Sequence, residues 1–148
     1  KVKYIAPFIS CIESVDSLKL MQEINKQALK NDRVIDCLLQ FHVAQEESKS
    51  GFSLEESEQV LSSEEFSSLK NIRIIGVMGM ATYTEDEKQI RKEFKTLVAN
   101  FAYLKMAYFS TNQDFKEISM GMTDDYKIAM SEGSTIVRVG SGIFDARS

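Results

Sequence analysis

The residues best suited to bind a ligand lie near the C-terminal end of the sequence, where a short apolar segment runs into a glycine-containing turn. Residues 118–125 read ISMGMTDD. The hydroxyls of Ser119 and Thr123 can donate hydrogen bonds, and Gly121 lets the backbone approach a ligand closely. Free amides of a turn that precedes a helix bind phosphate. The pattern therefore predicts a phosphate site, but an ordinary strand-to-helix turn has the same residues, and the two aspartates would repel a dianion.

A second segment of the same kind follows one helix and one strand later. Residues 137–144 read VRVGSGIF, so an apolar strand again ends in a turn of glycine and serine. In (β/α)8 barrels a phosphate commonly binds at the loops that follow strands seven and eight. The spacing of the two turns is the one that such a site requires.

Arg138 is a charged residue inside that apolar strand. It lies between two valines, and the two-residue period of a strand points it to the same side as Gly140. An unpaired buried charge is very costly, so we expect Arg138 to have a partner. That partner is either a carboxylate at a strand end, such as Glu13 or Asp16, or a bound ligand.

Strands and helices must hold these residues in place, and apolar runs alternate with helical periods along the sequence. Strands are expected over residues 9–15, 34–43, 72–80, 118–120 and 135–139, with a helix in each of the four intervals. Strands that alternate with helices in this way pair in parallel and are covered by the helices. A flavodoxin-like open sheet and a segment of a (β/α)8 barrel both fit the pattern.

Local signals indicate where the helices begin and end. Residues 53–56, SLEE, form a capping box, in which Ser and Glu satisfy each other's backbone amides. Asp16 or Ser17 is expected to cap the first helix, and Thr84 with Glu87 to form a second capping box. Asp124 and Asp125 are expected in the first turn of the last helix, and Gly133 at its end. A terminal turn is expected over residues 142–147.

Length and composition are those of an ordinary globular protein. The chain has 148 residues, of which 43% are hydrophobic and 27% charged. A formal net charge of -4 argues against a nucleic-acid partner, and the apolar runs are too short to cross a membrane. Cys11 and Cys37 lie in apolar stretches without CxxC spacing, so we expect reduced thiols in a cytoplasmic protein without a metal site.

Several segments, in order along the chain, resemble the pyridoxal 5′-phosphate homeostasis (YggS-like) family. Residues 119–125, 132–135 and 137–144 are similar to the C-terminal signature of that family. Residues 14–17, 46–51 and 76–80 are similar to its fourth strand, the loop after its fifth strand and its sixth strand. The resemblance implies an α/β fold, namely a partial (β/α)8 TIM barrel of the alanine racemase N-terminal type. It also implies a non-catalytic protein that binds pyridoxal 5′-phosphate and serves cofactor homeostasis.

The resemblance also implies roles for individual residues. Arg138 would face the pyridine nitrogen of the cofactor. Because a guanidinium cannot accept a proton, that nitrogen stays unprotonated, which disfavours carbanion chemistry. His42, the only histidine, either faces the pocket or is simply a polar residue at the barrel rim. The implied cofactor-binding set is Ser119, Met120, Gly121, Met122, Thr123, Arg138, Gly140 and Ser141, with His42 as an additional candidate; no catalytic residue is assigned.

The family has a Schiff-base lysine on its first strand, and no segment of this sequence resembles that motif. The sequence aligns with strands four to eight only, so we expect residues 1–148 to be a single domain that is the C-terminal fragment of a barrel. Binding of the cofactor would then be weak or absent. Five strands of eight leave two exposed parallel edges, so we expect self-association through the first and last strands.

Two enzymatic alternatives remain open. A phosphosugar isomerase or lyase on a similar barrel needs an acid or base at a strand end, where Glu13, Asp16 and His42 are the candidates. A racemase-like enzyme needs the lysine and an opposing acid–base residue, usually a tyrosine from another domain, and neither is identifiable in the sequence.

Overall fold

The computed structural model describes residues 1–45, 50–140 and 142–145, the last four by their backbone. Within these ranges one sheet has the strand order β1 (Cys11–Val15), β2 (Ile35–Gln40), β3 (Ile72–Met78), β4 (Glu117–Ser119), β5 (Ile136–Val139) and β6 (Gly142–Asp145). Each of the first five strands is parallel to its neighbour, as predicted, with boundaries that differ by up to three residues.

The end of the chain differs from the prediction. Residues 142–145 form β6, which pairs antiparallel with β5, where a turn over 142–147 was expected; residues 146 and 147 lie outside the described ranges. The prediction that the last parallel strand is an exposed edge is therefore wrong, because β6 occupies that edge. An unpaired strand edge presents backbone donors and acceptors, and the chain satisfies them here with its own next residues.

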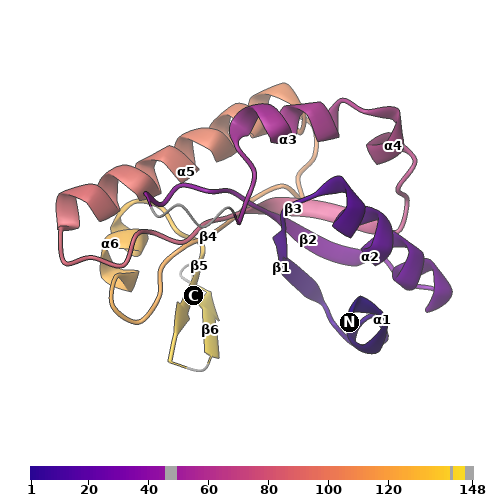
Figure 1. The fold of residues 1–148 in the computed structure, drawn as a ribbon, viewed down its shortest axis with the longest axis horizontal. Helices are drawn as coiled ribbons and strands as arrows, with labels where there is room; N and C mark the ends of the chain where they lie inside the picture. Colours follow the sequence, from indigo (N-terminus) through magenta and orange to yellow (C-terminus); the bar gives the residue numbers. More distant parts are fainter. Residues whose placement is uncertain (46–49, 141, 146–148) are drawn as a thin grey trace.

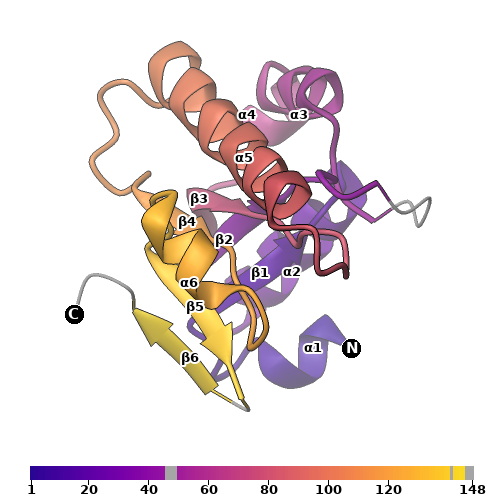
Figure 2. The same cartoon turned by 90° about the vertical axis from the view of Figure 1, so that its left-hand side faces the viewer.

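The helices of the described part are α1 (Val2–Ile5), α2 (Leu18–Lys30), α3 (Leu54–Leu61), α4 (Glu64–Ser67), α5 (Glu87–Ala107) and α6 (Tyr126–Ser131). The four expected helices are α2, α3, α5 and α6, and the short α1 and α4 were not expected. In Figure 1 the strands form an arch, with β3 at the top and β1 and β5 hanging down on either side, while α3 and α5 lie along the outer side. Figure 2 shows α6 covering β4 and β5 on that side.

The sheet is thus a curled, parallel half-barrel. Its strand order follows the chain order without a reversal. A flavodoxin-like sheet would place the second strand outside the first, so that alternative is excluded. The strand arrangement is that of part of a (β/α)8 barrel, in which sequential strands are neighbours.

The register of the parallel strands sorts their side chains onto two faces. Gln40, Met78, Ser119 and Ile136 are partners across β2 to β5, so they share one face. Residues two positions away share it as well. This inner face, on the hollow side of the arch, consists of Cys11, Glu13, Asp36, Leu38, Gln40, Arg73, Gly76, Met78, Glu117, Ser119, Ile136 and Arg138, where the register shift after Cys37 accounts for the three-residue step from Arg73 to Gly76.

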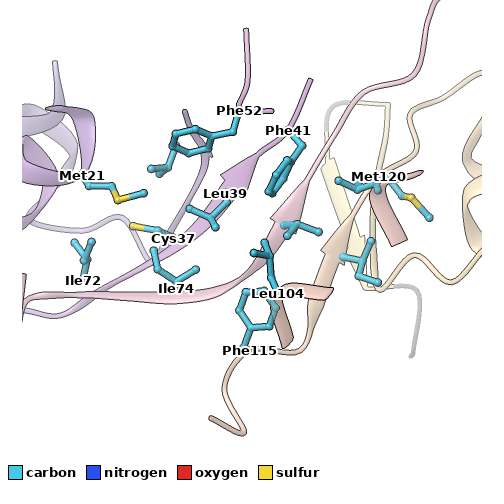
Figure 3. Close-up of a cluster of buried hydrophobic side chains, with 14 of the residues drawn as sticks. Met21, Cys37, Leu39, Phe41, Phe52, Ile72, Ile74, Leu104, Phe115 and Met120 are labelled. Atoms are coloured by element: carbon cyan, nitrogen blue, oxygen red, sulfur yellow. The ribbon is translucent and has the colours of Figure 1, made fainter. Parts of the chain in front are cut away.

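The outer face is apolar and packs against the helices. Its residues Cys37, Leu39, Val77 and Val137 belong to one cluster of buried side chains that includes Phe94 of α5. Figure 3 shows members of this cluster, among them Met21 from α2 and Leu104 from α5. The apolar residues whose spacing predicted the helices and strands are thus the residues that pack in this outer core.

Of the four predicted helix starts, two are confirmed and two are wrong, the second of these at the last helix. Ser17 caps α2 by accepting a hydrogen bond from the amide of Leu20 at 3.1 Å. The capping box of Ser53 and Glu56 is present, with hydrogen bonds of 2.8 and 3.1 Å. The second box is not formed, because α5 begins at Glu87 itself and Asp86 caps it instead. Glu87 is therefore the first residue of the helix and cannot reach back as a capping box requires.

The last helix begins later and is shorter than expected. α6 starts at Tyr126, so Asp124 and Asp125 precede its first turn, and their predicted place inside that turn is wrong. Gly133 follows the helix with φ 109° and ends it, as predicted. With six residues, α6 contributes little dipole to a ligand. A phosphate site at this place would depend on the turn and its hydroxyls.

Candidate functional site

The two glycine turns, with Gly121 and Gly140 19 residues apart in the sequence, lie against each other at the carboxyl ends of β4 and β5. The hydroxyl of Thr123 accepts a hydrogen bond from the amide of Gly140 at 3.0 Å. The amide of Arg138 donates to the carbonyl of Gly121 at 2.8 Å. These two bonds join the turns into one structure, which we call the double turn (residues 119–123 and 138–140).

Glycine is required at one position of the double turn and favoured at the other. Gly121 has φ 105°, and a Cβ there would lie 2.6 Å from the Cβ of Ala129 and 3.2 Å from Cγ1 of Val137. Any larger residue would push the turn away from α6 and β5. Gly140 has φ 64°, but a Cβ there would meet no atom within 4 Å. The space above Gly140 is open, so a ligand can approach its backbone.

Several of the predicted phosphate-binding amides are used within the chain. The amide of Met120 donates to the carbonyl of Ile136 in the sheet, at 3.1 Å. The amide of Met122 donates to the Asp125 carboxylate at 2.7 Å. In the described part of the chain no acceptor is recorded for the amides of Gly121 and Thr123. Ser141, also predicted to line the phosphate, lies outside the described residues.

Arg138 lies on the inner face and is held by a carboxylate, which is one of the two partners that the sequence suggested. Its Nη1 donates to Oε1 of Glu13 at 3.1 Å and to Oγ of Ser119 at 2.5 Å. The Ser119 hydroxyl donates in turn to the same Glu13 oxygen at 2.6 Å. The side chains of Glu13 and Arg138 are only 17% and 19% exposed, and Ser119 is fully buried. We call these three residues the interior triad.

The interior triad leaves one donor unused. Nη2 of Arg138 is buried and has no hydrogen-bond partner among the described residues. A buried donor without an acceptor costs about 1–3 kcal/mol. The guanidinium is therefore satisfied on one side and unsatisfied on the other.

The surroundings of the triad are acidic. Burial, together with the charges of Glu13, Asp36 and Glu117, raises the pKa of the Cys11 thiol to about 12. Burial likewise raises the pKa of Cys37 to about 12. Both residues are free cysteines. Because a thiolate is the reactive form, neither thiol is a nucleophile at neutral pH.

A groove of about 440 Å³ borders the double turn. It is lined by residues 122–125, by residues 80–84 and by Ile90. The 80–84 segment is held by Glu93, which is 5% exposed and accepts hydrogen bonds from the amide and hydroxyl of Thr82 at 2.6 and 2.7 Å. Glu93 was not among the predicted site residues. The signal that could have identified it is a carboxylate beside Ile90 and Phe94 on the buried side of a helix.

His42 lies at the rim but apart from the double turn. It is exposed and lines a separate hollow of about 100 Å³ together with Gln40 and Met80. Its backbone amide donates to the carbonyl of Phe52 at 3.0 Å. No recorded contact joins the His42 side chain to the double turn or to the interior triad.

Neither a metal centre nor a membrane span is visible in the ranges that the structure describes. No group of three or more His, Cys, Asp or Glu side chains there is arranged to hold a metal ion. None of the helices there is long and apolar enough to cross a bilayer.

The fold and the site together define a class of protein. Its members are parallel half-barrels or barrels with polar residues on the inner face and two interlocked glycine turns at the strand ends. The chain belongs to the family described as alanine racemase, N-terminal domain, whose model matches residues 5–148. The resemblance read from the sequence is thereby confirmed.

Three comparisons define its relatives more closely. The chain is 35% identical over 147 residues to a pyridoxal phosphate homeostasis protein of Aquifex aeolicus, covering 99% of this chain and 62% of the relative. It is similar to PipY of Synechococcus elongatus solved without PLP, with a TM-score of 0.85 and 26% identity, covering 95% of this chain and 64% of that one. For PipY with PLP bound, the TM-score is 0.81 and the identity 25%, and the match covers 95% of this chain and 63% of that one. The chain thus spans about three-fifths of the length of the curated relatives it matches.

Proposed function

We propose that this chain carries the phosphate-binding half of a pyridoxal 5′-phosphate site in a non-catalytic protein of cofactor homeostasis. The observation that carries the proposal is the guanidinium of Arg138 on the inner face. Its Nη1 is hydrogen-bonded, while its Nη2 is buried and has no partner among the described residues. The names of the Aquifex relative and of the PLP-bound PipY structure support the same ligand.

The donor set fits the cofactor. A pyridine nitrogen is an acceptor, and a guanidinium N–H can donate to it but cannot take up or supply a proton in return. Nη2 of Arg138 is buried and without a partner among the described residues, so an acceptor that reaches it relieves an existing cost. Because Nη2 is covered, the ligand must displace the atoms around it. A pyridoxal ring whose nitrogen stays unprotonated is a weak electron sink, which supports a role other than carbanion chemistry.

The phosphate would bind at the double turn. The amides of Gly121 and Thr123 have no recorded acceptor, and the open space over Gly140 admits a ligand. The Thr123 hydroxyl and the Gly140 amide, now bonded to each other, can both turn to phosphate oxygens. Ser119, Met120, Met122 and Ser141 complete the proposed set, although the Ser119 hydroxyl already serves the interior triad.

We further propose that binding is non-covalent and that residues 1–148 form one domain corresponding to part of a longer barrel. No lysine of this sequence lies in a segment like the family's Schiff-base motif. Strand β1 has a neighbour on one side only, so its free edge favours self-association. The two free cysteines favour a reducing, cytoplasmic compartment.

Titration of the purified protein with pyridoxal 5′-phosphate, followed by the absorbance of the ligand, tests the proposal. We expect weak but saturable binding, since no Schiff-base lysine is identified, and a further loss of affinity of at least about tenfold in Arg138→Leu, because a charge-assisted hydrogen bond is lost. Arg73→Leu is the matched control, since Arg73 pairs with Asp36 at the surface, and its binding should match that of the wild type. Saturable binding that is equal in all three proteins would contradict the assignment of Arg138.

The covalent state is tested separately by borohydride reduction of the mixture followed by peptide mass spectrometry. We expect no lysine to be modified preferentially. An adduct on one lysine at a one-to-one ratio would show that the chain does contain a Schiff-base lysine.

A further inference from the structure

Glu13 is the one charged member of the interior triad that the proposed site does not use. Its Oε1 accepts hydrogen bonds from both Ser119 and Arg138, at 2.6 and 3.1 Å. Glu13 comes from β1 and Arg138 from β5, which are not neighbours in the sheet. Strands β1 and β5 lie on either side of the hollow of the arch in Figure 1, and this contact joins them.

We propose that Glu13 is a positioning and specificity residue: it fixes the guanidinium of Arg138 through Nη1, so that Nη2 is the single donor offered to a neutral ring nitrogen. This inference rests on the proposed function and names the feature of the ligand that the site selects. The ligand class is a phosphorylated aromatic ring with an unprotonated ring nitrogen.

The geometry gives Glu13 this role in two ways. First, an arginine side chain has four rotatable bonds, and the bonds to Glu13 and to the fully buried Ser119 restrict it to one arrangement. Second, the carboxylate compensates the charge of Arg138 where the pair is more than four-fifths buried. A guanidinium whose charge is compensated does not attract every anion that enters the site. It selects a ligand by whether an acceptor lies along the direction of an Nη2–H bond.

Glu13 acts through Arg138, so a test must separate positioning from mere loss of structure. The ratio of two affinities does so, because unfolding of part of the protein lowers both equally. The two probes are pyridoxal 5′-phosphate and its 1-deaza analogue, in which a C–H group replaces the ring nitrogen. The phosphate and the ring are shared, and only the acceptor for Nη2 differs.

The wild-type protein should prefer pyridoxal 5′-phosphate over the deaza analogue by about tenfold, the size of one good hydrogen bond. In Glu13→Ala we expect that preference to fall to within about twofold of unity, while the affinity for the deaza analogue changes little. Glu13→Gln keeps an acceptor oxygen for Ser119 and Arg138 and should retain most of the preference. Asp36→Asn removes another inner-face carboxylate, one that pairs with Arg73 instead, and should leave the preference unchanged.

The outcomes distinguish the inference from the proposed function. If the wild type binds both probes and Glu13→Ala keeps the tenfold preference, Glu13 does not position Arg138 and the inference is wrong, while the proposed function stands. A wild type that binds both probes equally also overturns the inference, because Nη2 then meets no ring nitrogen. A wild type that binds neither probe overturns the proposed function and the inference with it. Thermal melts of all four proteins establish that each is folded. If Glu13→Ala is not folded, Glu13→Leu, which fills the space without an acceptor, takes its place, and a retained tenfold preference there overturns the inference.

Discussion

The two faces of the curled sheet differ in what holds them together. The outer face packs side chains such as Leu39, Val77 and Val137 against the helices, and all of them are buried. The inner face of the same strands carries Glu13, Ser119 and Arg138, linked by hydrogen bonds and shared charge. A strand turns alternate side chains to opposite faces, so one short segment can serve both purposes. Folding depends mainly on the outer face, and the proposed ligand binding depends mainly on the inner face.

The energetic contributions of the two faces follow from their chemistry. A fully buried large apolar side chain stabilises the fold by about 1.5–3 kcal/mol relative to its exposed state. A buried ion pair contributes little net stability, because the loss of hydration offsets the attraction between the charges. The inner face is therefore poorly explained by stability alone. A comparison of variants on the two faces can test this division.

The largest effect is expected from Phe94→Ala on the outer side. Phe94 is fully buried between α5 and the sheet, and its truncation leaves a cavity. We expect a loss of about 3–5 kcal/mol in the free energy of unfolding, measured by urea denaturation. The affinity for pyridoxal 5′-phosphate at a temperature where the variant is folded should be unchanged. A loss below about 1 kcal/mol would mean that the outer core is less tightly packed than its burial indicates.

The outer face is also the part that the sequence predicted well. Apolar residues at helical and strand periods identified the five parallel strands and four of the helices, because burial against one neighbouring layer imposes that period. Two features escaped prediction for physical reasons. Strand β6 forms because β5 has a free edge, which no local pattern reveals. Asp86 caps α5 because the helix begins at Glu87, and a two-residue shift of the helix start from the predicted cap at Thr84 does not change the apolar period inside the helix.

The inner face was harder to predict, although its members were identified. Glu13 and Arg138 are 125 residues apart in sequence, so their contact depends on how far the sheet curls. The sequence could offer Glu13 and Asp16 as partners but could not choose between them. It also could not show that the Ser119 hydroxyl joins the triad, or that Asp125 bonds to an amide of the predicted phosphate turn. These contacts are set by side-chain geometry rather than by period.

The next largest effect is expected where the two faces meet, at Gly121. An alanine there would have φ 105°, and its Cβ would lie 2.6 Å from the Cβ of Ala129. Backbone strain and overpacking would therefore both destabilise the variant. We expect Gly121→Ala to cost about 3 kcal/mol of unfolding free energy and to weaken ligand binding. Gly140→Ala is the matched control, since its φ is 64° and its Cβ would meet open space. It should cost about 1 kcal/mol, and equal losses in both variants would show that contact with α6 is not what requires Gly121.

A smaller effect is expected from the interior triad itself. Arg138→Leu leaves the Glu13 carboxylate mostly buried without its counter-charge, which should cost about 2 kcal/mol because the site is partly open to water. The double variant Glu13→Leu/Arg138→Leu removes both charges and should lie within about 1 kcal/mol of the wild type. Its affinity for pyridoxal 5′-phosphate should nevertheless be as low as that of the single variant. If the double variant is less stable than Arg138→Leu, the triad stabilises the fold and the proposed division between the faces does not hold.

The smallest effect concerns Asp125, whose carboxylate accepts the Met122 amide at 2.7 Å beside the double turn. Burial raises the pKa of Asp125 above its ordinary value of 3.8, and the charge of Asp124 adds to that rise, while the Met122 bond and Arg138 oppose it. An acid whose pKa is raised in the folded state stabilises the fold fully below its ordinary pKa and loses that stability as the pH rises through the raised value. Asparagine keeps the acceptor oxygen without the charge. Asp125→Asn should therefore be more stable than the wild type at pH 7, by less than about 1 kcal/mol.

That gain should shrink as the pH is lowered toward 3.8, because the wild-type carboxylate becomes protonated first in the folded state and then in the unfolded state. Urea denaturation of both proteins between pH 4 and pH 7 measures the difference. Asp124→Asn is the control, since the Asp124 carboxylate is exposed and no bond to the Met122 amide is recorded for it. A gain for Asp125→Asn that grows toward low pH would have the wrong sign for a buried acid. It would mean that the bond to Met122, rather than burial, dominates the pKa of Asp125, and that the carboxylate stabilises the predicted phosphate turn.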